Sequence, residues 1–295
     1  MFPEELGVKF GNYVNSIETD SYSLADKAKI IPELQKHLKE AISKRLIDDK
    51  TAAIAFSGGL DSSLIALIAS KDVKDIVLLA VGFENSQDII YAKKIAEFYN
   101  WNLKLKIISL PEAEEIVIKV VKMLKTADIV KVGVGCVVYA VLDLAWQNNI
   151  KTVLGGLGAE EIFAGYDRHR KKHLENPEAV HEECWRGLEN LYMQDLERDT
   201  AIAGHFKIRL LAPFLDDGLI KFAMKIDPKL KVSHNDKKII LKEAALSLGL
   251  EKEFAFRKKK AAQYGSYFHQ AIGKLTKKNG FKYKKDYLKS LLGQN

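Results

Sequence analysis

The chain has 295 residues, of which 47% are hydrophobic and 29% are charged, a balance that is typical of a globular protein and excludes disorder throughout. The formal net charge is +7, but it is uneven, because residues 251–295 hold 12 Lys and Arg against three Asp and Glu. The first 250 residues are therefore close to neutral, and the basic character belongs to a short C-terminal segment.

Two cysteines, Cys136 and Cys184, are too few for a disulfide framework or for a zinc site built mainly from cysteine. The N-terminus lacks the basic and apolar regions of a signal peptide. No apolar run reaches the roughly 18 residues that a membrane helix needs. We expect a cytoplasmic protein without a membrane partner.

Residues 1–30 show no clear period, and we expect them to form an irregular lead-in. From Pro32 to Asp48, apolar residues recur every four positions, which predicts an amphipathic helix with Pro32 in its first turn. Short apolar runs then alternate with helical patterns. The runs that predict strands are 51–56, 76–81, 103–108 and 151–154, and the helical patterns are 62–70, 86–99, 111–124 and 134–148. This alternation predicts an α/β fold in which helices flank a parallel sheet.

Strand signals end near residue 165. The later helical patterns cover 177–197, 217–226, 237–248 and 267–278. We therefore expect one domain over 31–265, with an α/β core up to about residue 165 and a helical part after it. Residues 266–295 would form a basic C-terminal helix or tail.

The sharpest motif lies between the first predicted strand and its helix, and it reads Ser57-Gly58-Gly59-Leu60-Asp61-Ser62-Ser63. Glycines let the backbone approach a ligand, and the following helix N-terminus attracts anions. The hydroxyls add donors, and the carboxylate of Asp61 could hold Mg²⁺. A plain turn with a helix cap is the alternative, but a cap needs only one such residue. The motif predicts a phosphate site.

Two other nucleotide motifs are excluded. The Walker pattern G-x-x-x-x-G-K-[ST] does not occur. Gly133-Val134-Gly135 lacks the third glycine of a dinucleotide fingerprint, and we expect it to form a tight turn.

The loop motif matches the SGG-x-DSS pyrophosphate loop of N-type ATP pyrophosphatases. Four further segments follow in the order found in asparagine synthetases: 81–88 (VGFENSQD), 154–166 (LGGLGAEEIFAGY), 212–216 (APFLD) and 256–259 (FRKK). From Pro32 to Gly265, the chain resembles the synthetase domain of the asparagine synthetase and β-lactam synthetase family. The resemblance implies the PP-loop, adenine nucleotide alpha hydrolase-like fold, with ATP cleaved between its α- and β-phosphates.

The resemblance also implies residue roles. Ser57, Gly58, Gly59, Leu60, Asp61, Ser62 and Ser63 would hold the pyrophosphate, and Phe56, Val81, Gly155 and Gly156 would line the adenosine site. Asp61 and Glu160 would ligate Mg²⁺, and Lys259 would act with Asp61 in catalysis by stabilising developing charge. As alternatives, Glu160 is a first-turn helix acid, and Lys258–Lys260 is a solvated run.

Three departures from the family pattern bear on function. Position 2 is Phe2, where the glutamine-hydrolysing members carry a nucleophilic cysteine, so we expect a stand-alone synthetase domain. Its nitrogen would come from free ammonia, a separate amidase subunit or an amine. Leu157 replaces the acid of S-G-E-G, and Arg209 and Leu211 replace the acid and base of E-x-R. The sequence thus supports adenylation better than asparagine formation.

The leading hypothesis is an AMP-forming ligase that uses Mg-ATP and a carboxylate, aspartate by resemblance. One alternative is an enzyme that adenylates an RNA base and docks RNA on its basic tail, where Phe281, Tyr283 and Tyr287 lie among lysines. We favour a tail whose aromatic residues pack on the domain. Another alternative is a nucleotide-binding regulator without catalysis, and a homodimer stays open. His169 and His173 have the spacing of a metal pair, but without a third ligand we interpret them as surface residues.

Overall fold

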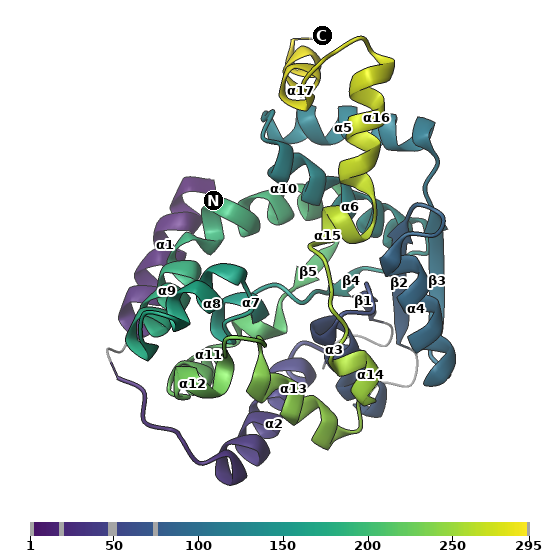
Figure 1. The fold of residues 1–295 in the computed structure, drawn as a ribbon. Coiled ribbons are helices and arrows are strands. Elements are labelled where there is room, and N and C mark those ends of the chain that lie inside the picture. The colour runs from purple at the N-terminus through teal and green to yellow at the C-terminus, as the bar shows by residue number, and fades with distance from the viewer. Residues whose placement is uncertain (1–2, 18–20, 47–51, 73–75, 294–295) are drawn as a thin grey trace.

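The computed structural model describes residues 3–17, 21–46, 52–72 and 76–293, and the side chains of all of these except 3–9 and 72. Its centre is a five-stranded parallel sheet in the order β3-β2-β1-β4-β5 (Figure 1). The strands are β1 Ala53–Ala55, β2 Val77–Gly82, β3 Asn102–Ile107, β4 Thr152–Leu154 and β5 Arg209–Leu211. The predicted fold class, a parallel sheet flanked by helices, is confirmed.

Alternate strand residues point into two separate cores. On β2, Leu78 and Ala80 belong to one hydrophobic cluster, while Val77, Leu79 and Val81 belong to the other. Because successive side chains of a strand face opposite sides, the sheet is covered on both faces. This double burial explains why its central strands are continuous apolar runs.

Helices from both halves of the chain cover each face (Figure 1). The first face carries α2 Lys27–Ser43, α3 Leu60–Asp72, α4 Gln87–Phe98, α7 Ala159–Ile162, α9 Pro177–Leu191, α11 Asp217–Met224, α13 Ile239–Leu248 and α14 Lys252–Ala255. The second carries α5 Leu110–Leu124, α6 Ile129–Gln147, α10 Glu197–Phe206, α16 Phe268–Lys278 and α17 Lys284–Leu292. Shorter pieces join them: α8 Asp167–His173, the π-helical turn η1 Tyr192–Leu196, the 3₁₀ turn η2 Pro213–Leu215, α12 Pro228–Lys231 and α15 Ala262–Gly265.

The prediction of an irregular N-terminus was wrong. Residues Pro3–Ile17 form α1, which packs against α9 and η1. The next helix, α2, begins at Lys27 rather than near Pro32, because the Asp26 side chain accepts a hydrogen bond from the Ala28 N–H and caps it. The predicted end of that helix at Asp48 lies outside the described residues.

The α/β part does not end near residue 165, because β5 pairs with β4 at the edge of the sheet. Residues 266–295 are not a separate tail either, since α16 and α17 pack on α5 and α6 and bury Phe268, Tyr287 and Leu288. As favoured from the sequence, Tyr287 packs on the domain. Tyr283, in contrast, is 59% exposed.

The turn predicted at Gly133-Val134-Gly135 was also wrong, because all three residues lie inside α6. Both glycines serve helix packing: a Cβ on Gly133 would lie 3.2 Å from Gln263 Cβ, and one on Gly135 would lie 3.0 Å from Val120 Cγ1. Among the described helices, α6 alone is long and apolar enough to cross a membrane, and 56% of that window is buried within the molecule, as in the core helix of a globular protein.

Candidate functional site

The phosphate loop, Ser57–Ser63, leaves the carboxyl end of β1 and leads into α3. Gly58 has a φ of +64°, and a Cβ there would lie 3.0 Å from the backbone carbon of Tyr91 on α4. Left-handed backbone in so close a contact requires glycine. The motif therefore folds into the tight turn expected from its residues.

The start of α3 has features that suit an anion. The first N–H groups of a helix have no partner within the helix and carry its positive dipole end. Ser62 Oγ donates to the Gly59 carbonyl oxygen at 3.2 Å, whereas Ser63 Oγ is buried and has no hydrogen-bond partner among the described residues. A buried hydroxyl without a partner leaves hydrogen-bonding capacity for a ligand.

The second signature segment lies beside this loop. The Gly155 N–H donates to the Leu211 carbonyl oxygen at 2.8 Å, which continues the β4–β5 pairing past the strand end. A Cβ on Gly156 would lie 3.0 Å from Asp61 Cβ. Glu160, in the first turn of α7, reaches the same place. Asp61, Gly156 and Glu160, far apart in sequence, thus come together.

Lys238 connects the two carboxylates, and the sequence analysis missed it. Its Nζ lies 2.8 and 2.9 Å from the two Asp61 carboxylate oxygens and 2.8 Å from Glu160 Oε1. Burial disfavours the charged amine, but Asp61 and Glu160 outweigh it and raise the pKa of Lys238. Burial also opposes ionisation of Glu160, yet the charges of Lys238 and Lys259 lower its pKa. Lys238 and Glu160 are therefore both charged near neutral pH.

Lys259 lies directly over the phosphate loop. A Cβ on Gly59 would lie 2.5 Å from Lys259 Cδ and 3.3 Å from its Nζ. The aliphatic part of this lysine crosses the loop backbone where only a glycine leaves room. Lys258, Lys259 and Lys260 are all exposed.

The residues predicted to line adenosine are at the expected ends of their strands. Phe56 and Val81 follow or close β1 and β2, and both are at least 95% buried. The Phe56 ring meets the Trp101 ring edge-on, with centroids 6.3 Å apart. Gly155 and Gly156 are half-buried at the end of β4.

The two positions that depart from the E-x-R pattern lie at opposite ends of β5. Leu211 is adjacent to Gly155, and its carbonyl oxygen accepts a hydrogen bond from the Gly155 N–H. Arg209 pairs in register with Thr152 and donates to its Oγ1 at 3.1 and 3.2 Å, at the amino ends of β4 and β5. Arg209 therefore lies at the end of β5 away from Gly155, while the half-buried Leu211 lies beside Gly155. The half-buried Leu157 directly follows Gly156, which packs against Asp61.

Glu161 is a buried acid that turns away from this centre. It accepts a hydrogen bond from the Tyr166 hydroxyl at 2.8 Å, and its Cγ lies close to Gly187 on α9. Burial raises the pKa of Glu161 to about 7.

The interpretation of both histidines as surface residues was wrong for His169. It is fully buried, and its Nδ1 accepts from the Tyr166 N–H at 3.1 Å, which fixes the start of α8. His173 is half-buried. Over the described ranges, no group of three or more His, Cys, Asp and Glu side chains could hold a metal ion unaided.

Comparison with known proteins identifies the family of this chain. The asparagine synthase family model matches residues 33–278. The chain is 36% identical over 285 residues to a putative glutamine-hydrolysing asparagine synthetase of Methanocaldococcus jannaschii, covering 85% of this chain and 52% of that protein. It is 34% identical to a probable asparagine synthetase of Acanthamoeba polyphaga mimivirus, covering 69% and 38%. The chain thus spans about half, or less, of the length of these relatives.

Among solved structures, the chain is similar to the NH3-dependent NAD synthetase of Campylobacter jejuni, at 14% identity and a TM-score of 0.40, with 92% of this chain and 94% of that chain covered. A score this low supports no inference about the site.

Proposed function

This chain belongs to the asparagine synthase family, and from that premise we propose that it is an ATP-dependent ligase that adenylates a carboxylate, releases pyrophosphate and transfers the acyl group to nitrogen. The observation that carries the proposal is the convergence of Glu160, Lys238 and Lys259 on the phosphate loop. A loop rich in N–H donors, beside two lysines and two carboxylates, suits a triphosphate with its counter-ion.

Each part of the site has a role in this reaction. The N–H groups and hydroxyls of Ser57–Ser63 bind the β- and γ-phosphates, while Phe56, Val81 and the Gly155-Gly156 backbone bind adenosine. Lys259 stabilises the charge that develops as the bond between the α- and β-phosphates breaks. Removal of one such donor typically costs about 3–4 kcal/mol of transition-state stabilisation.

The residues also fit a magnesium ion. Asp61 and Glu160 aim three carboxylate oxygens at one cation, the Lys238 ammonium group. Magnesium binds proteins through one or two carboxylates and takes its other ligands from phosphate oxygens and water. Asp61 and Glu160 would hold the ion, which when bound would neutralise charge on the phosphates.

Aspartate and ammonia are the default substrates, on family resemblance. Leu157 can neither accept a proton nor donate a hydrogen bond, so it cannot assist an attacking amine. The nitrogen donor would be ammonia or an amine that needs no such help. The carboxylate is the part of the reaction that the experiment must identify.

The experiment is pyrophosphate release from ATP with a panel of amino-acid and other carboxylates, with and without ammonia. We expect release with at least one carboxylate and none in the variant Asp61→Ala. Asp286→Ala, which removes an exposed first-turn acid of α17, is the matched control and should retain turnover. ATP binding without release across the panel would refute the catalytic proposal.

Each of two alternative functions is favoured by one observation. Leu157 favours a regulator that binds nucleotide without catalysis. If the variant Leu157→Glu gained amidation activity, the chain would instead be a synthetase that has lost this activity. An enzyme acting on an RNA base is favoured by exposed lysines around Tyr283 on the last two helices, and charge reversal there distinguishes it from the ligase.

A further inference from the structure

Arg257 is a buried cation that joins three separate segments. Its side chain is 2% exposed. Nη1 donates to the Ser57 carbonyl oxygen at 2.6 Å, and Nη2 donates to Asp88 Oδ1 at 2.9 Å. The guanidinium carbon lies 4.0 Å from the centre of the Tyr91 ring. Ser57 belongs to the phosphate loop, whereas Asp88 and Tyr91 lie on α4, so one planar group ties the loop and α4 to the segment after α14.

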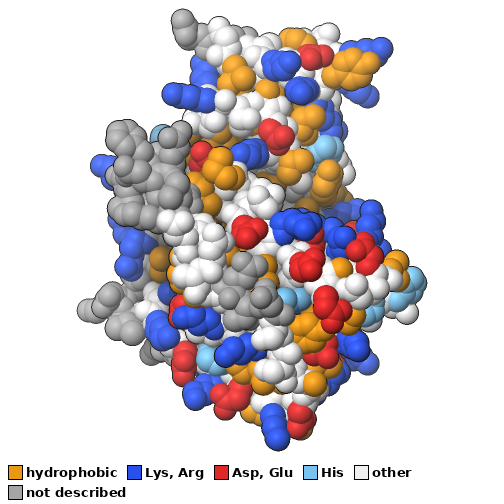
Figure 2. Space-filling view, turned by 90° about the vertical axis from the view of Figure 1, so that its left-hand side faces the viewer, with side chains coloured by type: hydrophobic (Ala, Val, Ile, Leu, Met, Phe, Trp, Pro, Cys, Tyr) orange, Lys and Arg blue, Asp and Glu red, His pale blue; other side chains and the backbone are white. Residues whose placement is uncertain are grey.

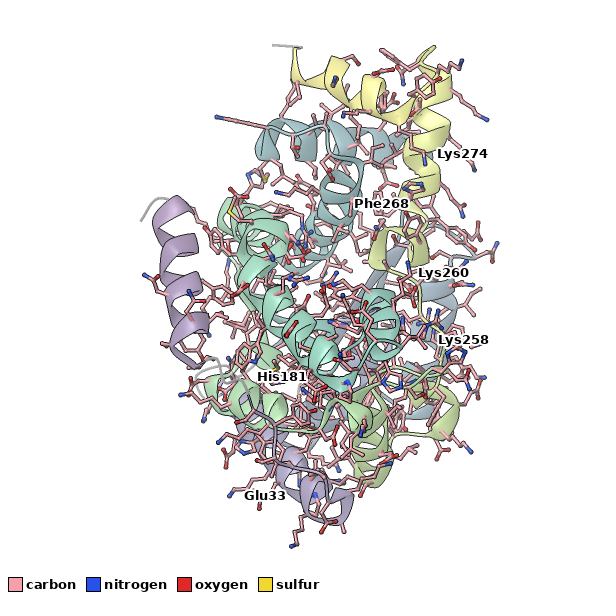
Figure 3. All side chains as sticks on the ribbon, turned by 60° about the vertical axis from the view of Figure 1, so that its left-hand side comes forward. Glu33, His181, Lys258, Lys260, Phe268 and Lys274 are labelled. Carbon is pink, nitrogen blue, oxygen red and sulfur yellow. The ribbon has the colours of Figure 1, made fainter. Side chains whose placement is uncertain are left out.

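This anchor fixes the position of Lys259. Residues 257–261, between α14 and α15, form neither helix nor strand. Only one residue separates Arg257 from Lys259, so holding the first restricts where the second can lie. Figure 3 shows Lys258 and Lys260 along one side of the molecule, on the segment between these helices. All three lysines of the run are exposed, and Lys259 also contacts Gly59 of the loop, which indicates that Arg257 directs this lysine towards the loop.

The other partners of the anchor are equally constrained. A Cβ on Gly265, in α15, would lie 2.6 Å from the carboxylate carbon of Asp88. On the opposite side, Gly58 of the loop packs against the Tyr91 backbone. The first turns of α4 therefore sit between the phosphate loop and the segment that carries Lys259, with no space for either to shift independently.

We propose that Asp88, Tyr91 and Arg257 form a clamp that positions Lys259 over the phosphate loop. This inference rests on the proposed function for its catalytic consequence. The three are positioning residues, because their contacts are with one another and with the loop backbone. An arginine is required, since its planar fork reaches two acceptors at once while a lysine ammonium has no such fixed geometry.

The first test is steady-state pyrophosphate release by Arg257→Lys, Asp88→Asn and Gly265→Ala. We expect kcat to fall between about 10- and 100-fold, as for a misplaced catalytic group, while KM for ATP changes less than about threefold. Asp88→Glu should recover part of the loss. Gly265→Ala is the most specific variant. Alanine normally stabilises a helix, so a loss of activity would come from the contact of its Cβ with the Asp88 carboxylate.

The matched control is Asp143→Asn, which breaks the Lys106–Asp143 ion pair, 2.7 Å long and remote in sequence and contact from the loop. It should keep wild-type kcat. The proposal is overturned if Asp143→Asn loses as much activity as Asp88→Asn, or if Arg257→Lys retains wild-type kcat.

The second test needs no activity. A lysine-specific protease should cleave after Lys258 or Lys260 at least about tenfold faster in Asp88→Asn and Gly265→Ala than in the wild type or Asp143→Asn, since neither variant adds a cleavage site and local opening governs cleavage. Equal cleavage rates would overturn the clamp. If the wild type releases no pyrophosphate but the protease result holds, the proposed function fails and the clamp stands.

Discussion

Lys238 occupies the place between two carboxylates where a divalent cation would be held. Its amine is nearly fully buried and lies within 2.9 Å of oxygens from both Asp61 and Glu160. Breaking a buried ion pair by removing one partner is costly because it leaves charge uncompensated. The carboxylates therefore need a cation at all times, whether lysine or metal.

Lys238→Met should make the protein's stability depend on magnesium in the absence of nucleotide. Without the amine, Asp61 and Glu160 face each other, and Mg²⁺ bound between them would raise Tm by about 2–4 °C. Thermal unfolding with and without Mg²⁺ measures this shift. The control is Lys231→Met, which removes a fully buried lysine whose amine contacts the Met224 sulfur at 3.9 Å. A Mg²⁺ response no larger than that of the wild type would contradict the prediction.

His169 should make stability fall in mild acid. Burial, with the charges of Arg168 and Lys231, lowers its pKa to about 3, against about 6.5 in an unfolded chain. Because the unfolded state takes up the proton first, stability is full above pH 6.5 and is lost as pH falls towards 3. Between pH 7.5 and pH 5 the loss is about 2 kcal/mol.

The variant His169→Gln tests this, since a glutamine oxygen can also accept from the Tyr166 N–H at this helix position. Urea unfolding at pH 7.5 and pH 5 should give a smaller difference for the variant than for the wild type. Parallel pH profiles would assign the acid sensitivity to other groups.

At the scale of elements, α6 depends on two glycines to pack closely. A Cβ on Gly135 would meet Val120 Cγ1 at 3.0 Å and Leu124 Cδ1 at 3.2 Å on α5. We expect Gly135→Ala to lower the free energy of unfolding by about 1–3 kcal/mol through overpacking. Gly204→Ala is the control, because nothing lies within 4 Å of its Cβ, and it should raise stability by about 0.5–1 kcal/mol. Chemical unfolding measures both, and effects of the same sign would contradict the packing argument.

The elements that the sequence predicts well are those whose burial is regular. Strands β1, β2 and β4 are short apolar runs because both faces are covered. Strand β5 has three residues at the sheet edge, partly exposed, and so lacks an apolar run. The sequence pattern of the α6 glycines predicts a turn. They are glycines because they contact Gln263 and α5, and such tertiary contacts do not show in the local sequence.

The same distinction applies to the site. Ser57–Ser63 could be predicted because a loop, a helix N-terminus and their donors are contiguous in sequence. The contacts of Lys238 and Arg257 could not be predicted from the sequence, because their partners lie more than 75 residues away in the chain. Their roles depend on how α13 and the segment after α14 pack on the sheet.

At the scale of the whole molecule, charge is distributed unequally. On the face in Figure 2, acidic and basic side chains are interspersed over the body. The last two helices and the loop between them carry five exposed lysines without an acidic partner among the described residues: Lys274, Lys277, Lys282, Lys285 and Lys289. Lys278 pairs with Glu114, and Lys284 contacts His269. The excess positive charge is therefore on the outer surface of α16 and α17.

Deleting this region would not test whether it binds RNA, because Tyr287, Leu288 and Leu291 are buried in the core formed with α5 and α6. We expect truncation after residue 280 to lower Tm sharply by exposing that core. The triple variant Lys282→Glu, Lys285→Glu and Lys289→Glu changes only exposed side chains, so stability should change little. Pyrophosphate release with a small carboxylate should then stay at the wild-type rate. Loss of single-stranded RNA binding together with loss of turnover would instead favour a nucleic-acid substrate, since phosphate contacts dominate such affinity.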